Sequence, residues 1–222
     1  MSTLSERIKF YTGAYMRVKM EDLLNMDDLN VTKKIILKCS KKAYQDLKRK
    51  VPYLYSISQR KDVEEGIWEN FCNLKKNFIQ EVDNIIYDNL VDEKGLLLCN
   101  NIEPSEIIEK ICELNEKYSN LFRLGQCITV GIAQKWVNMT LKYLWILGVY
   151  DDEYENRLEI PMDRYILEEM KVQSDLIPDE GWSEFNDIKQ YKEIQEEFYY
   201  ICLKEGYTRI GWENWKWLNT LV

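Results

Sequence analysis

Apolar residues recur every three or four positions along most of this chain, the spacing that gathers them on one face of an α-helix. Residues 35–47 and 67–86 show the pattern most clearly. Four prolines and nine glycines leave long uninterrupted stretches, and no segment alternates apolar and polar residues as a strand would. The pattern therefore predicts an all-α fold.

Short breaks divide the N-terminal half of the chain into helices. They fall near residues 27–30, at Val51-Pro52 and between Lys94 and Pro104. Pro104 suits the first turn of a helix from Ser105 to Tyr118, because a missing N–H and a fixed φ are tolerated there.

The most hydrophobic helical stretch covers residues 125–148, and Gly148 is well placed to end it as a C-terminal cap. An acidic segment, residues 150–159, follows it. Asp163 can then cap a helix from Arg164 to Val172. We expect two further helices, Ser183 to Lys204 and Trp212 to Leu221, joined by a turn around Gly206.

A chain of 222 residues is long enough to bury a core, as one domain or as two lobes that share an interface. No apolar run approaches the roughly 18 residues that span a bilayer. Residues 1–10 carry charges where a signal peptide would be apolar. We expect one helical domain over residues 1–222, with lobes of about residues 1–120 and 121–222, forming a cytoplasmic monomer with no membrane partner.

The residue types present limit the possible chemistry. The chain has no histidine, which excludes Ser-His-Asp and Cys-His catalytic groups and histidine-ligated metals. Its six cysteines lie far apart without a C-x-x-C pair, so we expect reduced, mostly buried thiols and no metal site. Lys, Asp, Glu, Tyr and Cys remain as catalytic candidates, and we expect no cofactor.

The net charge of −8 argues against simple nucleic-acid binding, but the charges are unevenly distributed. Residues 31–50 carry eight basic side chains and one acidic one, whereas residues 151–200 carry sixteen acidic and five basic ones. The basic segment can meet a phosphate backbone while the acidic segment faces away. Charge alone, however, favours the plainer interpretation that both are solvated helix faces.

The strongest motif is the run Thr129-Val130-Gly131-Ile132-Ala133-Gln134-Lys135, in which a glycine turn opens a helix. Backbone N–H groups at such a helix start can hold a phosphate without a side-chain charge. A second motif, Ile160-Pro161-Met162-Asp163, places an aspartate 28 residues after the lysine. A lysine amine beside a carboxylate is an arrangement suited to attack on a sugar carbon.

A lysine with an ordinary pKa of about 10.4 is protonated at neutral pH and needs burial or a nearby cation to become a nucleophile. Lys142 lies two turns after Lys135 on the same helix face, and the helix N-terminus adds partial positive charge. Asp163 can stabilise positive charge on the sugar and assist proton movement. The simpler interpretations are a solvated lysine and an aspartate that only caps its helix.

These motifs resemble the helix-hairpin-helix superfamily of base-excision DNA glycosylases, and within it the archaeal 8-oxoguanine branch. The resemblance covers about residues 125–218 and departs from the family at Ala133, where a second glycine is usual. It rests on Gln134-Lys135, Lys142, Ile160 to Asp163, the Tyr191 to Gln195 pattern and the tryptophan-bearing stretch Trp212 to Leu218.

The resemblance implies a two-lobed helix-hairpin-helix glycosylase fold and damaged double-stranded DNA as the partner. It makes Lys135 the nucleophile that forms a Schiff base and Asp163 its catalytic carboxylate. Gly131 and Ala133 would hold a DNA phosphate. The remaining implied site residues, which would surround the extruded base, are Gln134, Met139, Lys142 and Trp217.

Stacking on a flipped base is worth about 1–3 kcal/mol per aromatic platform. Trp136, Trp215 and Trp217 are candidates, and the resemblance favours Trp217. We otherwise assign Trp212, Trp215 and Trp145 to the core, where most tryptophans at helical spacing lie.

Three functional hypotheses follow. The first is a DNA glycosylase with AP lyase activity on an oxidised purine such as 8-oxoguanine. The second is a catalytically inactive relative that serves as a nucleotide-binding or protein-interaction module, for example in phage–host conflict. The third is a helical scaffold that docks a partner through its aromatic C-terminal helix. DNA binding that weakens steeply with salt favours the first.

Overall fold

The computed structural model describes residues 13–26, 28–98, 102–177, 179 and 181–220. Over these residues the chain is all-α, as the sequence predicts, and β pairing is limited to two isolated bridges. The α-helices are α2 (Met20–Leu24), α3 (Leu29–Leu47), α4 (Glu65–Leu90), α5 (Pro104–Lys117), α6 (Val130–Ile146), α7 (Arg164–Lys171), α8 (Ile188–Lys204) and α9 (Arg209–Thr220). Short 3-10 helices are η1 (Ile57–Asp62), η2 (Ser119–Leu121) and η3 (Asp152–Arg157).

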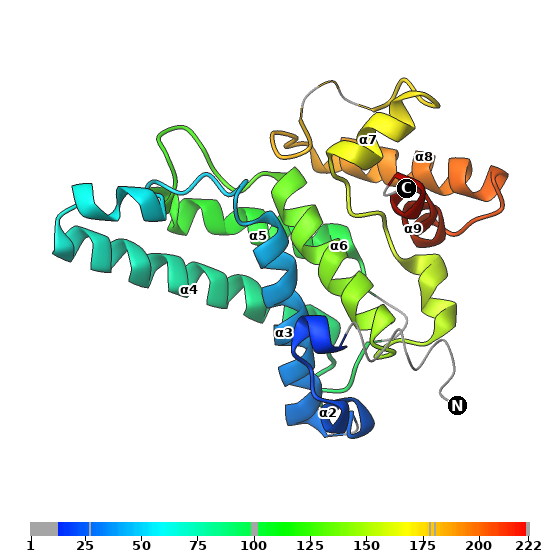
Figure 1. Ribbon diagram of the computed structural model, residues 1–222, viewed down its shortest axis with the longest axis horizontal. Helices are drawn as coiled ribbons and strands as arrows, with labels where there is room; N and C mark the ends of the chain where they lie inside the picture. Colours follow the sequence, from blue (N-terminus) through cyan, green and yellow to red (C-terminus); the bar gives the residue numbers. More distant parts are fainter. Residues whose placement is uncertain (1–12, 27, 99–101, 178, 180, 221–222) are drawn as a thin grey trace.

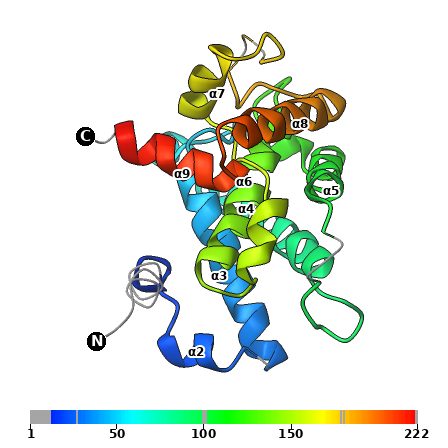
Figure 2. The same ribbon diagram turned by 90° about the vertical axis from the view of Figure 1, so that its right-hand side faces the viewer.

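Helix α6 is the central element of the fold. It packs along α3 and against α5, and the two views show α3 and α6 side by side (Figures 1 and 2). Trp136 is fully buried in this interface, with its ring centroid 4.8 Å from that of Tyr44. Its indole N–H donates to the Ser40 carbonyl and hydroxyl at 3.1 and 2.9 Å. Trp136 therefore lies in the core and is not available to stack on a base.

The remaining helices form two groups around α6. In Figure 1, α4 and α5 extend to one side of α6, and α7, α8 and α9 gather on the other. Helix α8 packs on α9, and η3 contacts both α6 and α9. Apolar side chains from both groups form one continuous core. No helix in the described part of the chain is both long enough and apolar enough to cross a membrane.

Several predicted helix ends are confirmed. Pro104 is the first residue of α5. Gly148 adopts a positive φ of 75° just after α6, and its N–H bonds back to the Trp145 carbonyl at 2.8 Å. Gly206, with φ of 81°, turns the chain between α8 and α9. Glycine is favoured at both turns because a Cβ disfavours this left-handed conformation.

Helix α6 begins at Val130, within the predicted glycine turn, although residues 125–129 of the predicted hydrophobic stretch precede it. Two predicted helix starts are wrong: α8 begins at Ile188 instead of Ser183, and α9 begins at Arg209 instead of Trp212. Residues 183–187 lie against the start of α6, and Asp187 caps α8 by accepting N–H bonds from Lys189 and Gln190. Asp187 therefore marks the start of α8, and the residues before it pack against α6 instead of extending α8. The predicted helix end at Leu221 and the charged residues 1–10 lie outside the described residues.

Candidate functional site

Lys135 and Asp163 lie side by side. The distance from Lys135 Nζ to Asp163 Oδ2 is 3.0 Å, and each side chain is only 14% exposed. Lys135 projects from the second turn of α6, while Asp163 is the N-cap of α7. The other carboxylate oxygen, Oδ1, accepts the N–H of Ile166 at 3.0 Å. The aspartate therefore caps its helix and pairs with the lysine at the same time, so its orientation is fixed.

Gln134 explains why the two motifs meet. It is fully buried, and its amide donates to the Met162 carbonyl at 2.8 Å and accepts from the Met162 N–H at 3.0 Å. Because Met162 directly precedes Asp163, this pairing holds the second motif against α6. Both ends of the amide are used within the protein, so in this conformation Gln134 acts as a structural clip and offers no free group to a substrate.

A second buried glutamine secures the same segment. Gln195 of α8 accepts from the Ile160 N–H at 3.0 Å and donates to the Ile160 carbonyl at 2.8 Å. Tyr191, one turn earlier, accepts from Asn138 at 2.8 Å and donates to Glu159. Burial raises the pKa of the Glu159 carboxyl, and the bond from Tyr191 opposes that rise. Tyr191 and Gln195, noted together in the sequence, therefore hold Glu159 and Ile160 in place at the start of the second motif.

Gly131 is required for close packing. A Cβ at this position would lie 1.6 Å from the carbonyl oxygen of Trp182, so any side chain would displace that backbone. The Gly131 N–H donates to the Phe185 carbonyl at 2.8 Å, and the Ala133 N–H bonds to the Thr129 carbonyl at 3.0 Å within the helix. Both N–H groups expected to hold a DNA phosphate are therefore already used in this conformation.

Lys142 has a partner that sequence reasoning missed. Its ammonium lies 2.8 Å from the carboxylate of Glu213 on α9, and both side chains are buried. Burial raises the pKa of the Glu213 carboxyl; Lys142 and Lys135 oppose that rise and Asp163 adds to it. The four residues form a cluster with no formal net charge, so Glu213 offsets the cation expected to activate Lys135. The only available signal was one acid among the tryptophans of the last helix.

Trp182 covers the lysine and was also not predicted. Lys135 Nζ lies 4.9 Å from the centroid of the indole, which is within the range of a cation–π contact. Trp182 is only 8% exposed. Its position, directly after Gly181 in the connection between α7 and α8, gives no periodic signal from which its location could be inferred.

The other proposed pocket residues are less enclosed. Met139 is half-buried against the core. Trp217 is 36% exposed, and its ring centroid lies 5.0 Å from that of Tyr165. Trp212 lies in the core as expected, and Trp145 is partly buried against it. Trp215 is 43% exposed, so its assignment to the core was wrong.

Two adjoining clefts lie beside the covered lysine. The first, here the Arg123 cleft, has a volume of about 530 Å³ and is lined by Arg49, Lys50, Arg123 and the start of α6. The second, the Trp182 cleft, has a volume of about 250 Å³ and is lined by Lys50, Trp182 and side chains of α7. They share Lys50, Ser183 and Glu184. Neither Lys135 nor Asp163 is among their described lining residues, but Trp182, which contacts Lys135, lines the second cleft.

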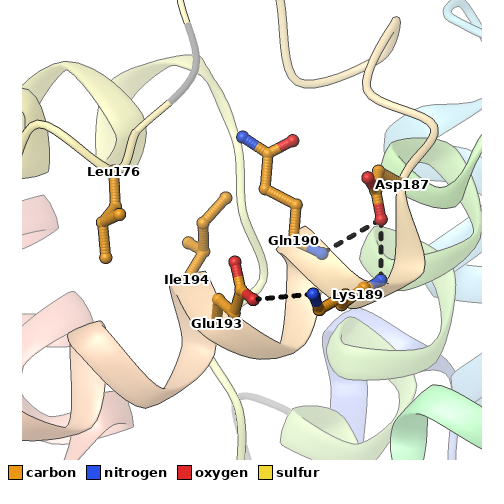
Figure 3. Close-up of a pocket in the computed structure, with 6 residues that line it drawn as sticks. All are labelled: Leu176, Asp187, Lys189, Gln190, Glu193 and Ile194. Atoms are coloured by element: carbon orange, nitrogen blue, oxygen red, sulfur yellow. Dashed lines mark hydrogen bonds and ion pairs between the residues drawn. The ribbon is translucent and has the colours of Figure 1, made fainter.

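A third depression, of about 280 Å³, lies at the start of α8 (Figure 3). Its polar groups mainly interact with one another within α8. Asp187 accepts hydrogen bonds from the N–H groups of Lys189 and Gln190, and the ammonium of Lys189 lies 3.8 Å from the carboxylate of Glu193. Leu176 faces these side chains from the preceding connection. This arrangement is that of a capped helix start and offers no catalytic group.

Within the described residues, no group of three or more Cys, Asp or Glu side chains is arranged to hold a metal ion. Comparisons with protein-family models, with curated proteins and with solved structures give no match.

Proposed function

We propose that the protein is a DNA glycosylase with AP lyase activity of the helix-hairpin-helix type, acting on an oxidised purine such as 8-oxoguanine. The observation that carries the proposal is the 3.0 Å contact between Lys135 and Asp163 in a largely buried position. Lys135 and Asp163, 28 positions apart in the sequence, are brought together, and Gln134 acts as a clip that holds their two motifs against each other. We also propose that the protein is a monomer located in the cytoplasm.

The proposed reaction starts from the neutral Lys135 amine. Its lone pair forms a bond to C1′ of the damaged nucleotide as the glycosidic bond breaks, and the base leaves with the bonding electrons and takes up a proton. Asp163 accepts the proton lost by the lysine nitrogen and stabilises positive charge on the sugar. The sugar ring then opens, its oxygen is protonated, and an imine joins Lys135 to C1′.

A two-lobed arrangement with DNA between the lobes is part of this proposal. Both clefts are lined by Lys50, which follows α3, and by Ser183, which precedes α8 in the group formed by α7, α8 and α9. Lys135 on α6 and Asp163 at the start of α7 likewise join the central helix to the group formed by α7, α8 and α9. This placement supports a substrate that approaches between α3 and that group.

The Arg123 cleft supplies the cations that a DNA backbone needs. Arg49, Lys50 and Arg123 line it, and none of them forms an ion pair with another described residue. Several lysines earlier in the basic segment are instead paired internally, for example Lys34 with Asp22 at 2.8 Å. We therefore assign phosphate binding to these three side chains in place of the N–H groups of Gly131 and Ala133.

The extruded base would lie near Met139, Lys142 and Trp217. Trp217 is exposed enough to stack and is braced by Tyr165, whose hydroxyl donates to the Lys216 carbonyl at 3.0 Å. A braced aromatic ring loses little freedom when a base stacks on it.

Borohydride trapping on a panel of duplexes tests this proposal. Each duplex carries one damaged base or an abasic site, and hydride reduction converts the imine into a stable secondary amine. A covalent adduct formed by the wild type and absent in Lys135→Gln supports the mechanism, and the panel identifies the base. Absence of any adduct with a folded protein would contradict it.

The second candidate, an inactive relative that binds a nucleotide or a protein partner, is favoured by the charge balance of the cluster. Lys135 is held as an ion pair, and Glu213 offsets Lys142, so no uncompensated cation is present to free the amine. Retention of DNA or nucleotide binding without trapping would support it. The scaffold hypothesis would instead be favoured by self-association or partner docking through Trp215 and Leu218, which are exposed on α9.

A further inference from the structure

Trp182 lines the Trp182 cleft and also contacts Lys135. The centroid of its indole lies 4.9 Å from Lys135 Nζ. Trp182 is 8% exposed and the Lys135 side chain is 14% exposed, so a flat aromatic ring packs against a largely buried amine beside the cleft.

The backbone that follows Trp182 is firmly anchored. Thr129 donates through its hydroxyl to the Ser183 carbonyl at 2.9 Å, Gly131 donates to the Phe185 carbonyl at 2.8 Å, and the Val130 N–H donates to the Asn186 side chain at 3.1 Å. These bonds attach residues 183–186 to the start of α6. A rotation of the Trp182 side chain would leave all of these backbone bonds intact.

We propose that Trp182 is a gate residue, which covers Lys135 in the free protein and must swing aside before a carbonyl or sugar carbon can reach the amine. This inference deepens the proposed function and rests on it. It identifies the Trp182 cleft as the route of entry and makes the free protein a resting state in which Lys135 is shielded by both Asp163 and the indole.

Reductive methylation of the free protein tests the gate without DNA. Formaldehyde condenses with an accessible amine, losing water to form an imine, and cyanoborohydride delivers the hydride that reduces it to a methylamine. Peptide mass spectrometry then gives a labelling rate for each lysine. We expect Trp182→Ala to raise the rate at Lys135 by about tenfold, the order of effect associated with loss of a partly desolvated cation–π contact.

Trp215→Ala is the matched control. It removes an indole that lies 5.2 Å from Lys216 on α9, so the rate at Lys216 can change while the rate at Lys135 stays at the wild-type value. Trp182→Phe keeps an aromatic cover and is expected to label between the wild type and Trp182→Ala. If Trp182→Ala fails to fold, Trp182→Phe alone decides the test, because the gate still requires its labelling rate at Lys135 to exceed that of the wild type.

A rescue experiment distinguishes specific shielding of Lys135 by the Trp182 indole from a general loss of structure in the variant. Trp182→Gly leaves a space of indole shape, and added indole is expected to restore protection at Lys135 but not at other lysines. Equal Lys135 labelling in the wild type, Trp182→Phe and Trp182→Ala would overturn the gate. Failure of the proposed function would appear separately, as absence of trapped DNA in proteins whose labelling still follows Trp182.

Discussion

The side chain of Gln134 pairs with the backbone of Met162 through two hydrogen bonds, one donated and one accepted. Each partner has a neighbour in the candidate site, because Lys135 follows Gln134 and Asp163 follows Met162. The 3.0 Å contact between lysine and aspartate is therefore built directly onto a buried clip. The clip therefore sets the backbone positions from which the two charged side chains meet.

Gln134→Ala should be strongly destabilising. The change leaves the Met162 N–H and carbonyl buried without partners, and each such group costs about 1–3 kcal/mol. We expect the free energy of unfolding, measured by urea denaturation, to fall by about 2–4 kcal/mol. Gln190→Ala, on the shallow depression at the start of α8, is the matched control and should change little. A similar small loss in both variants would refute the clip.

Gly131→Ala should destabilise the contact between α6 and the connection that carries Trp182. The new Cβ would lie 1.6 Å from the Trp182 carbonyl oxygen, so the backbone must shift. Overpacking of this kind costs about 1–3 kcal/mol. Gly66→Ala, near the start of α4 with open space around its Cβ, should be neutral or slightly stabilising. The melting temperatures of the two variants test this difference. An unchanged melting temperature for Gly131→Ala would mean that Gly131 does not lie this close to the Trp182 carbonyl.

Asp83 should make stability depend on pH. Burial raises the pKa of its carboxyl from 3.8 to about 6, although Ser40 donates a hydrogen bond to it at 2.5 Å. The folded state thus binds this proton more tightly than the unfolded state, and the contribution of Asp83 to stability falls as pH rises from about 4 to about 6. Asp83→Asn should flatten this part of the profile and raise stability at pH 7. Denaturation curves across the range test it; an unchanged profile in Asp83→Asn would contradict it.

The Arg123 cleft should control the salt dependence of DNA binding. Each cation that contacts a phosphate contributes roughly 0.9 to the slope of log affinity against log salt. Replacing Arg49, Lys50 or Arg123 by alanine should therefore weaken binding to any sequence and reduce the slope by about 1. Lys94→Ala, in the turn after α4, is the control. Equal slopes in the cleft and control variants would place the DNA elsewhere.

The sequence predicted what depends on local spacing. Helix positions follow from apolar residues three and four apart, and Pro104, Gly148 and Asp163 mark helix ends through their own backbone chemistry. The meeting of Lys135 and Asp163 could be anticipated only from the resemblance of the two motifs.

Features that depend on contacts distant in sequence could not be predicted. Glu213 pairs with Lys142 across 71 positions, and Thr129 reaches Ser183 across 54. The first contact balances the charge of the cluster, and the second attaches the segment after Trp182 to the start of α6. None leaves a periodic pattern in a single sequence.

The most direct test of the account uses a duplex with one abasic site, on which imine formation needs no base excision. Lys135→Arg keeps the positive charge beside Asp163 but removes the nucleophilic amine, and Lys142→Arg is the matched control within the same cluster. We predict a borohydride-trapped adduct with the wild type, mapped by peptide mass spectrometry to Lys135, a weaker one with Lys142→Arg, and none with Lys135→Arg. An adduct of equal yield in Lys135→Arg, or no adduct with the folded wild type, would contradict the assignment of Lys135 as the nucleophile.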